Sequence, residues 1–229
     1  MHIGILQAGH APAPVAASHG DYTDYFQSLL DGHDLTFTTW DVVDMDFPDG
    51  PDAADGWLIT GSRHGAYEDH EFIPPLEDFI RAVKSSGRPM IGICFGHQII
   101  AQALGGTVEK FAGGWSIGRR EYNTANGPIA LNAWHQDQVI KAPEGARTIA
   151  SNDFCTHAGL VYGDTILTFQ PHPEIRGDIM HDYLHKVGTD PDRFPQDMIS
   201  QAQSDHGRPN TEGAIADQMA AFFRGEATL

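Results

Sequence analysis

Cysteine is scarce in this sequence, which excludes a small scaffold stabilised by disulfides. Only two of the 229 residues are cysteines, Cys94 and Cys155, and they provide no disulfide framework. Such a chain suits a reducing compartment in which a thiolate stays available, so we expect a cytoplasmic protein. Cys155 has no glycines around it, and we interpret it as a structural residue.

Positive charge is also in short supply. The 14 lysines and arginines against 31 aspartates and glutamates give a formal net charge of −17, which argues against a nucleic-acid partner. No apolar run approaches the roughly 20 residues that a membrane span needs. The first residues also lack the basic segment and the small-residue cleavage site of a signal peptide. We therefore expect neither a nucleic-acid partner nor a membrane partner.

The sequence lacks internal repeats and low-complexity segments, so its organisation must be taken from the alternation of strand and helix patterns. The first half alternates regularly. Apolar or β-branched runs predict strands at residues 2–7, 35–40, 56–60 and 89–93, and helical patterns lie at 21–30 and after Pro74. This order predicts a parallel, doubly wound sheet.

The second half of the chain has a different pattern. Residues 107–169 contain short strands with turn signals between them, which predicts a mixed or antiparallel extension of the sheet. An amphipathic helix at 175–187, a polar stretch at 188–210 and a last helix carrying Ile215, Met219, Phe222 and Phe223 follow. We therefore predict a three-layer α/β fold, with a mostly parallel central sheet flanked by helices. We expect a single domain over residues 1–229, with a core of about 1–187 and a C-terminal helical extension at 188–229.

One cysteine stands at a strand-to-helix turn. Cys94 lies between Gly92 and Gly96, after an apolar strand and before a helical stripe that Gly105 ends. A turn this sharp strains the backbone of its central residue, so small residues must flank it. The pattern is typical of a nucleophile elbow. The backbone N–H of Phe95, at the start of the helix, is available to stabilise an oxyanion.

A histidine and a carboxylate follow a later strand. His172 and Glu174 are two residues apart in a segment stiffened by Pro171 and Pro173, so both side chains can project from one side of an extended backbone. Glu174 could then orient the imidazole as a general base for Cys94. A loop histidine beside a helix-start glutamate explains the same residues. The local sequence leaves both interpretations open.

The elbow Gly-Ile-Cys-Phe-Gly-His-Gln at 92–98 and the segment Gln-Pro-His-Pro-Glu at 170–174 together resemble the class I glutamine amidotransferases. The resemblance runs from the first strand to about Glu174 and implies a flavodoxin-like fold. It implies that Cys94 is the nucleophile, His172 the general base and acid, and Glu174 its orienting partner. It also implies that Gly61 and Phe95 donate the oxyanion N–H groups.

The same resemblance implies where a small-molecule γ-glutamyl substrate binds. Gln98 matches the position that holds the α-amino acid end of the substrate, and the segment containing Trp134, Gln136 and Asp137 matches one that lines the glutamine pocket. Arg63, in the loop after Gly61, is a further expected contact. The implied reaction forms and hydrolyses a γ-glutamyl thioester on the cysteine. It needs no cofactor and no metal.

Departures from the common family pattern bear on the substrate. Pro171 replaces a frequent phenylalanine, and the loop after Gly61 continues as Ser-Arg-His-Gly at 62–65. These features resemble the stand-alone branch that is related to the amidotransferase part of guanylate synthase and includes γ-glutamyl peptidases. Because the stretch after Glu174 is too short for a synthetase, one alternative is a glutaminase subunit that supplies ammonia to a separate synthetase. A regulatory module that senses glutamine without turnover is the non-enzyme alternative.

Several other residues deserve an interpretation. The loop containing His64, Glu68 and His70 could hold a metal, but we favour a solvated acidic loop. His135 lacks a carboxylate neighbour as compact as the one beside His172, and His97 is expected to pack locally within the elbow helix. The glycine- and proline-containing segment 8–20 could lie over the site.

Overall fold

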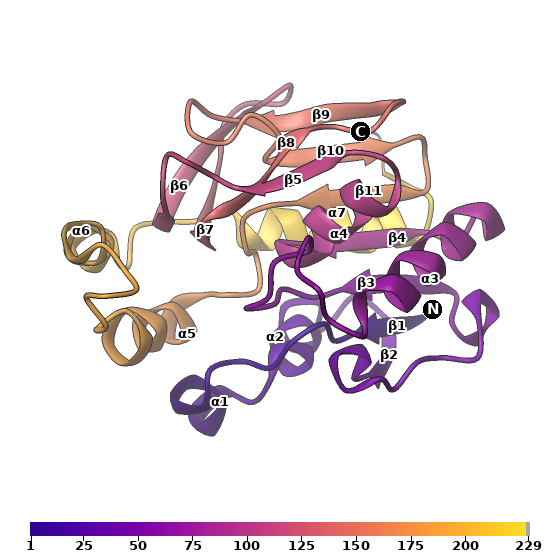
Figure 1. Cartoon of the computed structure of the whole chain (residues 1–229), viewed down its shortest axis with the longest axis horizontal. Coiled ribbons are helices and arrows are strands. Elements are labelled where there is room, and N and C mark those ends of the chain that lie inside the picture. The colour runs from indigo at the N-terminus through magenta and orange to yellow at the C-terminus, as the bar shows by residue number, and fades with distance from the viewer. Residues whose placement is uncertain (228–229) are drawn as a thin grey trace.

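A mixed nine-stranded sheet forms the centre of the protein, which we describe over residues 1–227 from a computed structural model (Figure 1). Its strand order is β2-β1-β3-β4-β11-β10-β9-β6-β7. The parallel part comprises β2 (Thr36–Trp40), β1 (His2–Leu6), β3 (Gly56–Ile59), β4 (Met90–Ile93) and β11 (Ile166–Phe169). The antiparallel part comprises β10 (Gly159–Tyr162), β9 (Ala146–Ser151), β6 (Ser116–Thr124) and β7 (Ile129–His135). A separate two-stranded sheet pairs β5 (Thr107–Lys110) with β8 (Asp137–Lys141).

Helices cover both faces of the parallel strands. On one face α3 (Ile73–Ser86) and α4 (Phe95–Ala103) pack against Trp57 and Ile59 of β3. On the other face α2 (Tyr22–Leu29) and α7 (Glu212–Phe223) pack against Leu58 of the same strand. Neighbouring residues of β3 therefore belong to different layers, which is why an all-apolar strand is required there. The predicted three-layer α/β fold with a mostly parallel sheet is confirmed.

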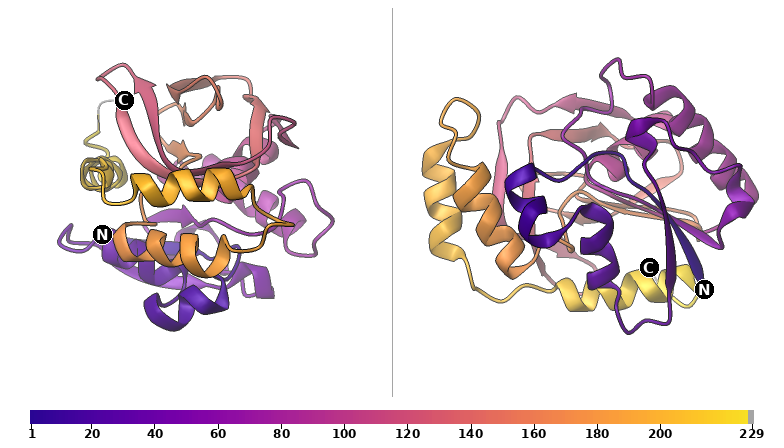
Figure 2. Two further views of the ribbon diagram at one scale, coloured as in Figure 1. Left: turned by 90° about the vertical axis from the view of Figure 1, so that its left-hand side faces the viewer. Right: turned by 90° about the horizontal axis from the view of Figure 1, so that it is seen from below.

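A third group of helices lies at one end of the sheet (Figure 2). It consists of α1 (Ala13–His19), α5 (Gly177–Asp182), the π-helical turn η3 (Tyr183–Val187) and α6 (Gln196–Asp205), which share an apolar cluster. The sequence patterns predicted one helix at 175–187, and the structure instead divides this stretch into α5 and η3. Two short 3₁₀ turns, η1 (Val42–Asp44) and η2 (Pro51–Ala53), complete the regular structure.

Two of these helices correct the sequence-based predictions. The stretch 188–210, expected to be a polar connection, contains α6, which buries only Ile199 and Ala202. The segment 8–20, expected to be a loop, contains α1, which buries Val15. Both helices are short and have few apolar residues, so their periodic pattern is weak.

The region expected to be a C-terminal extension contributes to the main core. Met219 and Phe223 of α7 share a cluster with Ile3 and Ile5 of β1. The single-domain organisation stays a prediction. Within residues 1–227, no helix is both long enough and apolar enough to cross a membrane.

The order of the central strands brings three loops together. β3, β4 and β11 are neighbours and run parallel, so their carboxyl ends lie at one edge of the sheet. Gly61 follows β3, Cys94 follows β4, and the segment containing His172 follows β11. Ligands of open parallel sheets bind beyond such an edge. The topology therefore places the three expected parts of the site side by side.

Candidate active site

Cys94 occupies a strained backbone position at the start of α4. Its φ of 54° and ψ of −102° lie outside the conformations that non-glycine residues normally adopt. The glycines on either side make this turn sterically feasible. A Cβ atom at Gly92 would lie 2.5 Å from the carbonyl oxygen of Gly96, and a Cβ atom at Gly96 would collide with the carbonyl oxygen of Ile59. The expected elbow is therefore present in the structure.

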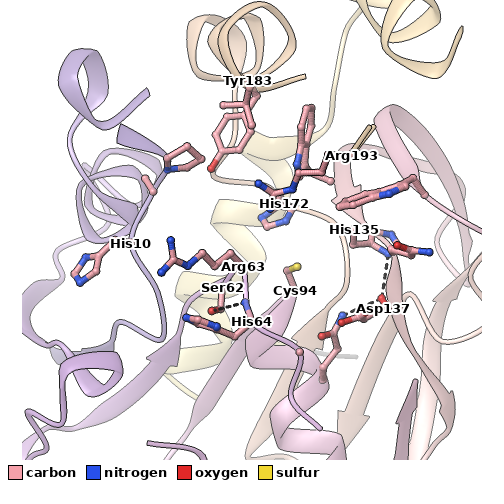
Figure 3. A pocket seen from close by; sticks show the side chains of 18 of the residues that line it. His10, Ser62, Arg63, His64, Cys94, His135, Asp137, His172, Tyr183 and Arg193 are labelled. Atoms are coloured by element: carbon pink, nitrogen blue, oxygen red, sulfur yellow. Dashed lines mark hydrogen bonds between the residues drawn. The ribbon is translucent and has the colours of Figure 1, made fainter. Parts of the chain in front are cut away.

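His172 and Glu174 form a buried pair beside the cysteine. The His172 Nδ1 and a Glu174 carboxylate oxygen are 2.6 Å apart, and Glu174 has no exposed surface. A carboxylate is an acceptor, so Nδ1 carries the hydrogen and the other ring nitrogen is left for Cys94. Figure 3 shows the Cys94 sulfur beside the His172 ring. The structure thus favours the paired interpretation of these residues over an isolated loop histidine.

The strand β7 fixes the segment that carries this pair, a contact that the sequence analysis missed. The backbone N–H of His172 donates to the carbonyl oxygen of Asn132 at 2.8 Å. The side-chain amide of Asn132 donates to the carbonyl oxygen of Ile175 at 2.7 Å. Two hydrogen bonds from one residue therefore hold both ends of the His-Pro-Glu segment. No local signal in the sequence indicates that Asn132 has this role.

The environment of His172 raises its pKa. Burial by itself would lower the pKa, but the negative charge of Glu174 and the interactions with Cys94 outweigh this effect. A histidine whose pKa is raised therefore lies next to the Cys94 sulfur, in an arrangement typical of a nucleophile and its base.

The backbones of Gly61 and Phe95 lie beside Cys94. A Cβ atom at Gly61 would be 3.2 Å from His172 Cε1 and 3.8 Å from Cys94 Cβ, so this backbone borders the reacting groups. The Thr60 hydroxyl donates to the Gly61 carbonyl oxygen at 2.9 Å and fixes the orientation of that peptide. Phe95 is the first residue of α4, where an amide has no partner within the helix. Both residues are therefore close to the cysteine, and their role as oxyanion donors stays a prediction.

Cys94 and His172 line a cavity of about 680 Å³, a size typical of small-molecule sites. All the residues expected to contact substrate line this cavity: Arg63, Gln98, Trp134, Gln136 and Asp137. Its walls also include Tyr183, Arg193 and Phe194, which the sequence analysis did not identify. They come from η3 and the connection to α6, and Figure 3 shows Tyr183 and Arg193 on the same side of the cavity as His172.

Two of the expected substrate residues also have structural roles. The Gln98 side-chain amide donates to the Asp137 carbonyl oxygen at 2.9 Å and to the Gln170 side-chain oxygen at 3.1 Å. Only its carbonyl oxygen remains available to a substrate. Trp134 packs against the rings of Tyr183 and Phe194 at centroid distances of 5.2 and 5.1 Å. These contacts hold the cavity walls together.

Charged groups of both signs face the cavity. Asp137 is half-buried, and burial raises its pKa. Arg63 and Arg193 have no carboxylate partner among residues 1–227, and the Arg193 guanidinium lies 5.0 Å from the centre of the Phe194 ring. Unpaired arginines beside a cavity are suited to binding anionic groups of a ligand.

Two further histidines near the site are buried and neutral. Burial, followed by the influence of neighbouring histidines, lowers the pKa values of His97 and His135 to about 3. His97 Nδ1 is hydrogen-bonded to the Thr168 hydroxyl at 2.8 Å, and His135 Nδ1 donates to the Asp137 carbonyl oxygen at 3.2 Å. Neither of these contacts is with a carboxylate, unlike the contact that orients His172. Cys155 is also buried, and this burial raises its pKa to about 12, which makes it a poor nucleophile.

The chain is similar in sequence and in fold to several known proteins. Residues 13–188 match the family model "Glutamine amidotransferase class-I". A glutamine amidotransferase-like protein of Schizosaccharomyces pombe is 28% identical over 97% of this chain and 98% of its own length. Gamma-glutamyl peptidase 4 of Arabidopsis thaliana is 31% identical over 74% of each chain. A solved glutamine amidotransferase structure from Methylobacillus flagellatus superimposes with a TM-score of 0.74 at 20% identity, covering 98% of this chain and 93% of that one.

Proposed function

Since the chain belongs to the class I glutamine amidotransferase family, we propose that it hydrolyses a γ-glutamyl amide through a thioester on Cys94. The observation that carries this proposal is the strained elbow of Cys94 beside the buried His172–Glu174 pair. The elbow exposes one sulfur to the cavity, and the pair supplies a histidine held in one orientation.

The reaction follows from the positions of these groups. The Cys94 thiolate attacks the γ-carbonyl carbon, and the resulting oxyanion accepts hydrogen bonds from the backbone N–H groups of Gly61 and Phe95. His172 protonates the leaving amine as the carbon–nitrogen bond breaks, which leaves a γ-glutamyl thioester. His172 then removes a proton from water, which attacks the thioester. The products are glutamate and the amine, and the thiolate is restored.

The charged walls of the cavity suggest how the glutamyl part is held. The carboxylate of Asp137 complements the α-ammonium group of a glutamyl substrate, and the carbonyl oxygen of Gln98 offers a second acceptor. Arg63 complements the α-carboxylate. Trp134 and Gln136 complete the wall beside these groups.

The remaining space favours a γ-glutamyl peptide over free glutamine. A cavity of about 680 Å³ matches ligands of drug size, whereas glutamine is a single amino acid. Arg193 faces the same cavity and can bind a carboxylate in the leaving group. The similarity to a protein named gamma-glutamyl peptidase supports this choice.

The proposal is tested with a panel of substrates that includes glutamine, glutathione and other γ-glutamyl dipeptides. We expect the wild-type protein to release amine or amino acid faster from the peptides than from glutamine. We expect Cys94→Ala to lose turnover and Cys155→Ala, its matched control, to keep it. Equal turnover by Cys94→Ala would contradict the proposed chemistry.

The same panel separates the alternative functions. Activity on glutamine alone that rises when a synthetase co-purifies would favour an ammonia-supplying subunit over a peptidase. Binding of glutamine without a thioester in the mass spectrum of the protein would favour a sensing module.

A further inference from the structure

Three side chains that can bind a metal meet in the loop after Gly61. The candidate ligand atoms of His64, Glu68 and His70 all lie within 4.8 Å of one another. His70 Nε2 is 2.8 Å from a Glu68 carboxylate oxygen, and His64 Nδ1 is 3.9 Å from the same oxygen. Two ligand atoms on one zinc ion lie about 3–4 Å apart, because each is about 2 Å from the ion. Small side-chain rotations therefore suffice to place all three on one ion.

The fold of the loop produces this cluster. The Glu68 N–H donates to the Gly65 carbonyl oxygen at 3.0 Å, and the His70 N–H donates to the Glu68 carbonyl oxygen at 3.1 Å. The buried ring of Phe72 lies against both imidazoles, with centroid distances of 5.9 Å to each. The three ligands are thus held together by backbone turns and by an aromatic wall before any ion binds.

The chemistry of the three groups suits a divalent transition ion. Two imidazole nitrogens and one carboxylate oxygen are a ligand set that zinc commonly takes with water in the fourth position. A histidine binds such an ion through a neutral ring nitrogen.

We propose that His64, Glu68 and His70 bind one zinc-class divalent ion at the rim of the active-site cavity. His64 and Glu68 both line that cavity, so the ion sits at its edge. The ion links the two halves of the loop that begins at the oxyanion donor Gly61 and ends at Phe72. The bound ion stiffens this loop and takes no part in the thioester chemistry. The site stands on its own residues and does not depend on the proposed substrate.

This inference revises the expectation of a solvated acidic loop. An ordinary surface pair would explain the contact between Glu68 and His70. It does not require a second imidazole, yet the ring of His64 lies 4.1 Å from that of His70. The close approach of two imidazoles and one carboxylate is the observation that favours an ion.

The test is calorimetric titration of the full chain with zinc chloride, in a Cys94→Ala background so that the active-site thiol binds no zinc. We expect one ion per chain. Glu68→Gln and His70→Ala should each weaken binding about tenfold or more. Replacing zinc with cobalt should give the visible absorption of a four-coordinate ion, and both variants should lose it.

A matched control comes from a second imidazole pair. The rings of His181 and His185 stack at 4.1 Å far along the chain, and a double alanine variant should leave zinc affinity unchanged within about twofold. Glu68→Gln keeps the size of the side chain, so it decides the outcome even if His70→Ala fails to fold. Absence of binding, or binding lost only in the His181 and His185 variant, would overturn the proposal.

Discussion

At the scale of single residues, the candidate site depends on charges that burial makes strong. Glu174 has no exposed surface, so water does not screen the electrostatic attraction between its carboxylate and His172. Burial by itself would lower the pKa of His172, and the charge of Glu174 is the largest of the influences that raise it above its ordinary value. The pKa of His172 should therefore change when the charge of Glu174 is removed.

Glu174→Gln should separate orientation from charge. The amide keeps the size of the side chain but removes the negative charge, so the pKa of His172 should fall and kcat should drop by a factor on the order of 10² to 10⁴. The measurement is a pH–rate profile for γ-glutamyl peptide hydrolysis. Its histidine-dependent limb should move to lower pH in the variant.

The control for this change is Asp178→Asn, which removes an exposed carboxylate on α5. Its profile should match that of the wild-type protein. An unchanged profile in Glu174→Gln would contradict the assigned role of the carboxylate.

A buried histidine should make stability depend on pH. Burial lowers the folded-state pKa of His97 to about 3, whereas an unfolded histidine has a pKa near 6.5. Below about pH 6.5 the unfolded chain binds a proton that the folded chain does not bind. His97 therefore lowers the free energy of unfolding as the pH falls from 6.5 toward 3, by about 1.4 kcal/mol per pH unit.

His97→Asn tests this effect, because asparagine can keep the hydrogen bond to Thr168 and does not titrate. Urea unfolding at about pH 7.5 and about pH 5 should show that the variant loses about 2 kcal/mol less than the wild-type protein over this interval. His135, shifted in the same direction, and His172, shifted in the opposite one, contribute equally to both proteins and cancel. An identical pH dependence in the two proteins would show that His97 is not buried in its neutral form.

At the scale of elements, the turn from β4 to α4 is the feature with the least steric freedom. The backbone at Gly96 passes so close to the Ile59 carbonyl oxygen of β3 that no Cβ atom fits between them. The helix start and two strands are thereby fixed together. A change at this glycine should disturb the elbow as a unit.

Gly96→Ala should lower the free energy of unfolding by about 1–3 kcal/mol, because overpacking displaces the elbow. Activity should fall as well, since Cys94 and the N–H of Phe95 move with the turn. Chemical unfolding and turnover measure the two effects. Gly213→Ala is the control, because this glycine lies in α7 with open space at its Cβ position, and it should be neutral or stabilising by up to about 1 kcal/mol. A normal stability of Gly96→Ala would contradict the geometry of the turn.

Elements with strong patterns could be predicted from the sequence, and weak ones could not. The strand ending at Ile93 has only apolar residues around a glycine, and the helix containing Phe79 has a complete apolar face. Helices α1 and α6 bury very few side chains. Both helices pack against η3 at one end of the sheet, and their helical conformation depends on this packing. Apolar periodicity in the sequence does not detect it.

At the scale of the whole molecule, a strongly acidic protein presents unpaired cations at one cavity. The net charge of −17 repels anionic substrates in general, whereas Arg63 and Arg193 face the cavity without a carboxylate partner within residues 1–227. Binding of the γ-glutamyl peptide that we propose as substrate would therefore depend on these two local charges, because the field of the whole protein opposes it.

Arg193→Ala should raise KM about tenfold for γ-glutamyl peptides whose leaving group carries a carboxylate. KM for glutamine, which lacks that carboxylate, should change by less than about twofold. Steady-state kinetics with both substrates checks this difference.

Arg88→Ala is the control, because Arg88 pairs with Asp52 and does not line the cavity. It should leave both KM values unchanged. An equal rise for glutamine and peptide in Arg193→Ala would place Arg193 at the glutamyl end and contradict its assignment to the leaving group.

The sequence by itself determined the alternation of strands and helices and the elbow around Cys94, whereas it left the pairing of His172 with Glu174 open until the structure showed their contact. These features depend on residues close together in the chain, where apolar periodicity, glycine spacing and prolines act directly. Only the tertiary structure decided that Asn132 holds the His172 segment, that Tyr183 and Arg193 complete the cavity, and that His64 and His70 meet over Phe72. Those contacts arise from strand order and loop packing, and the local sequence around each side chain does not specify them.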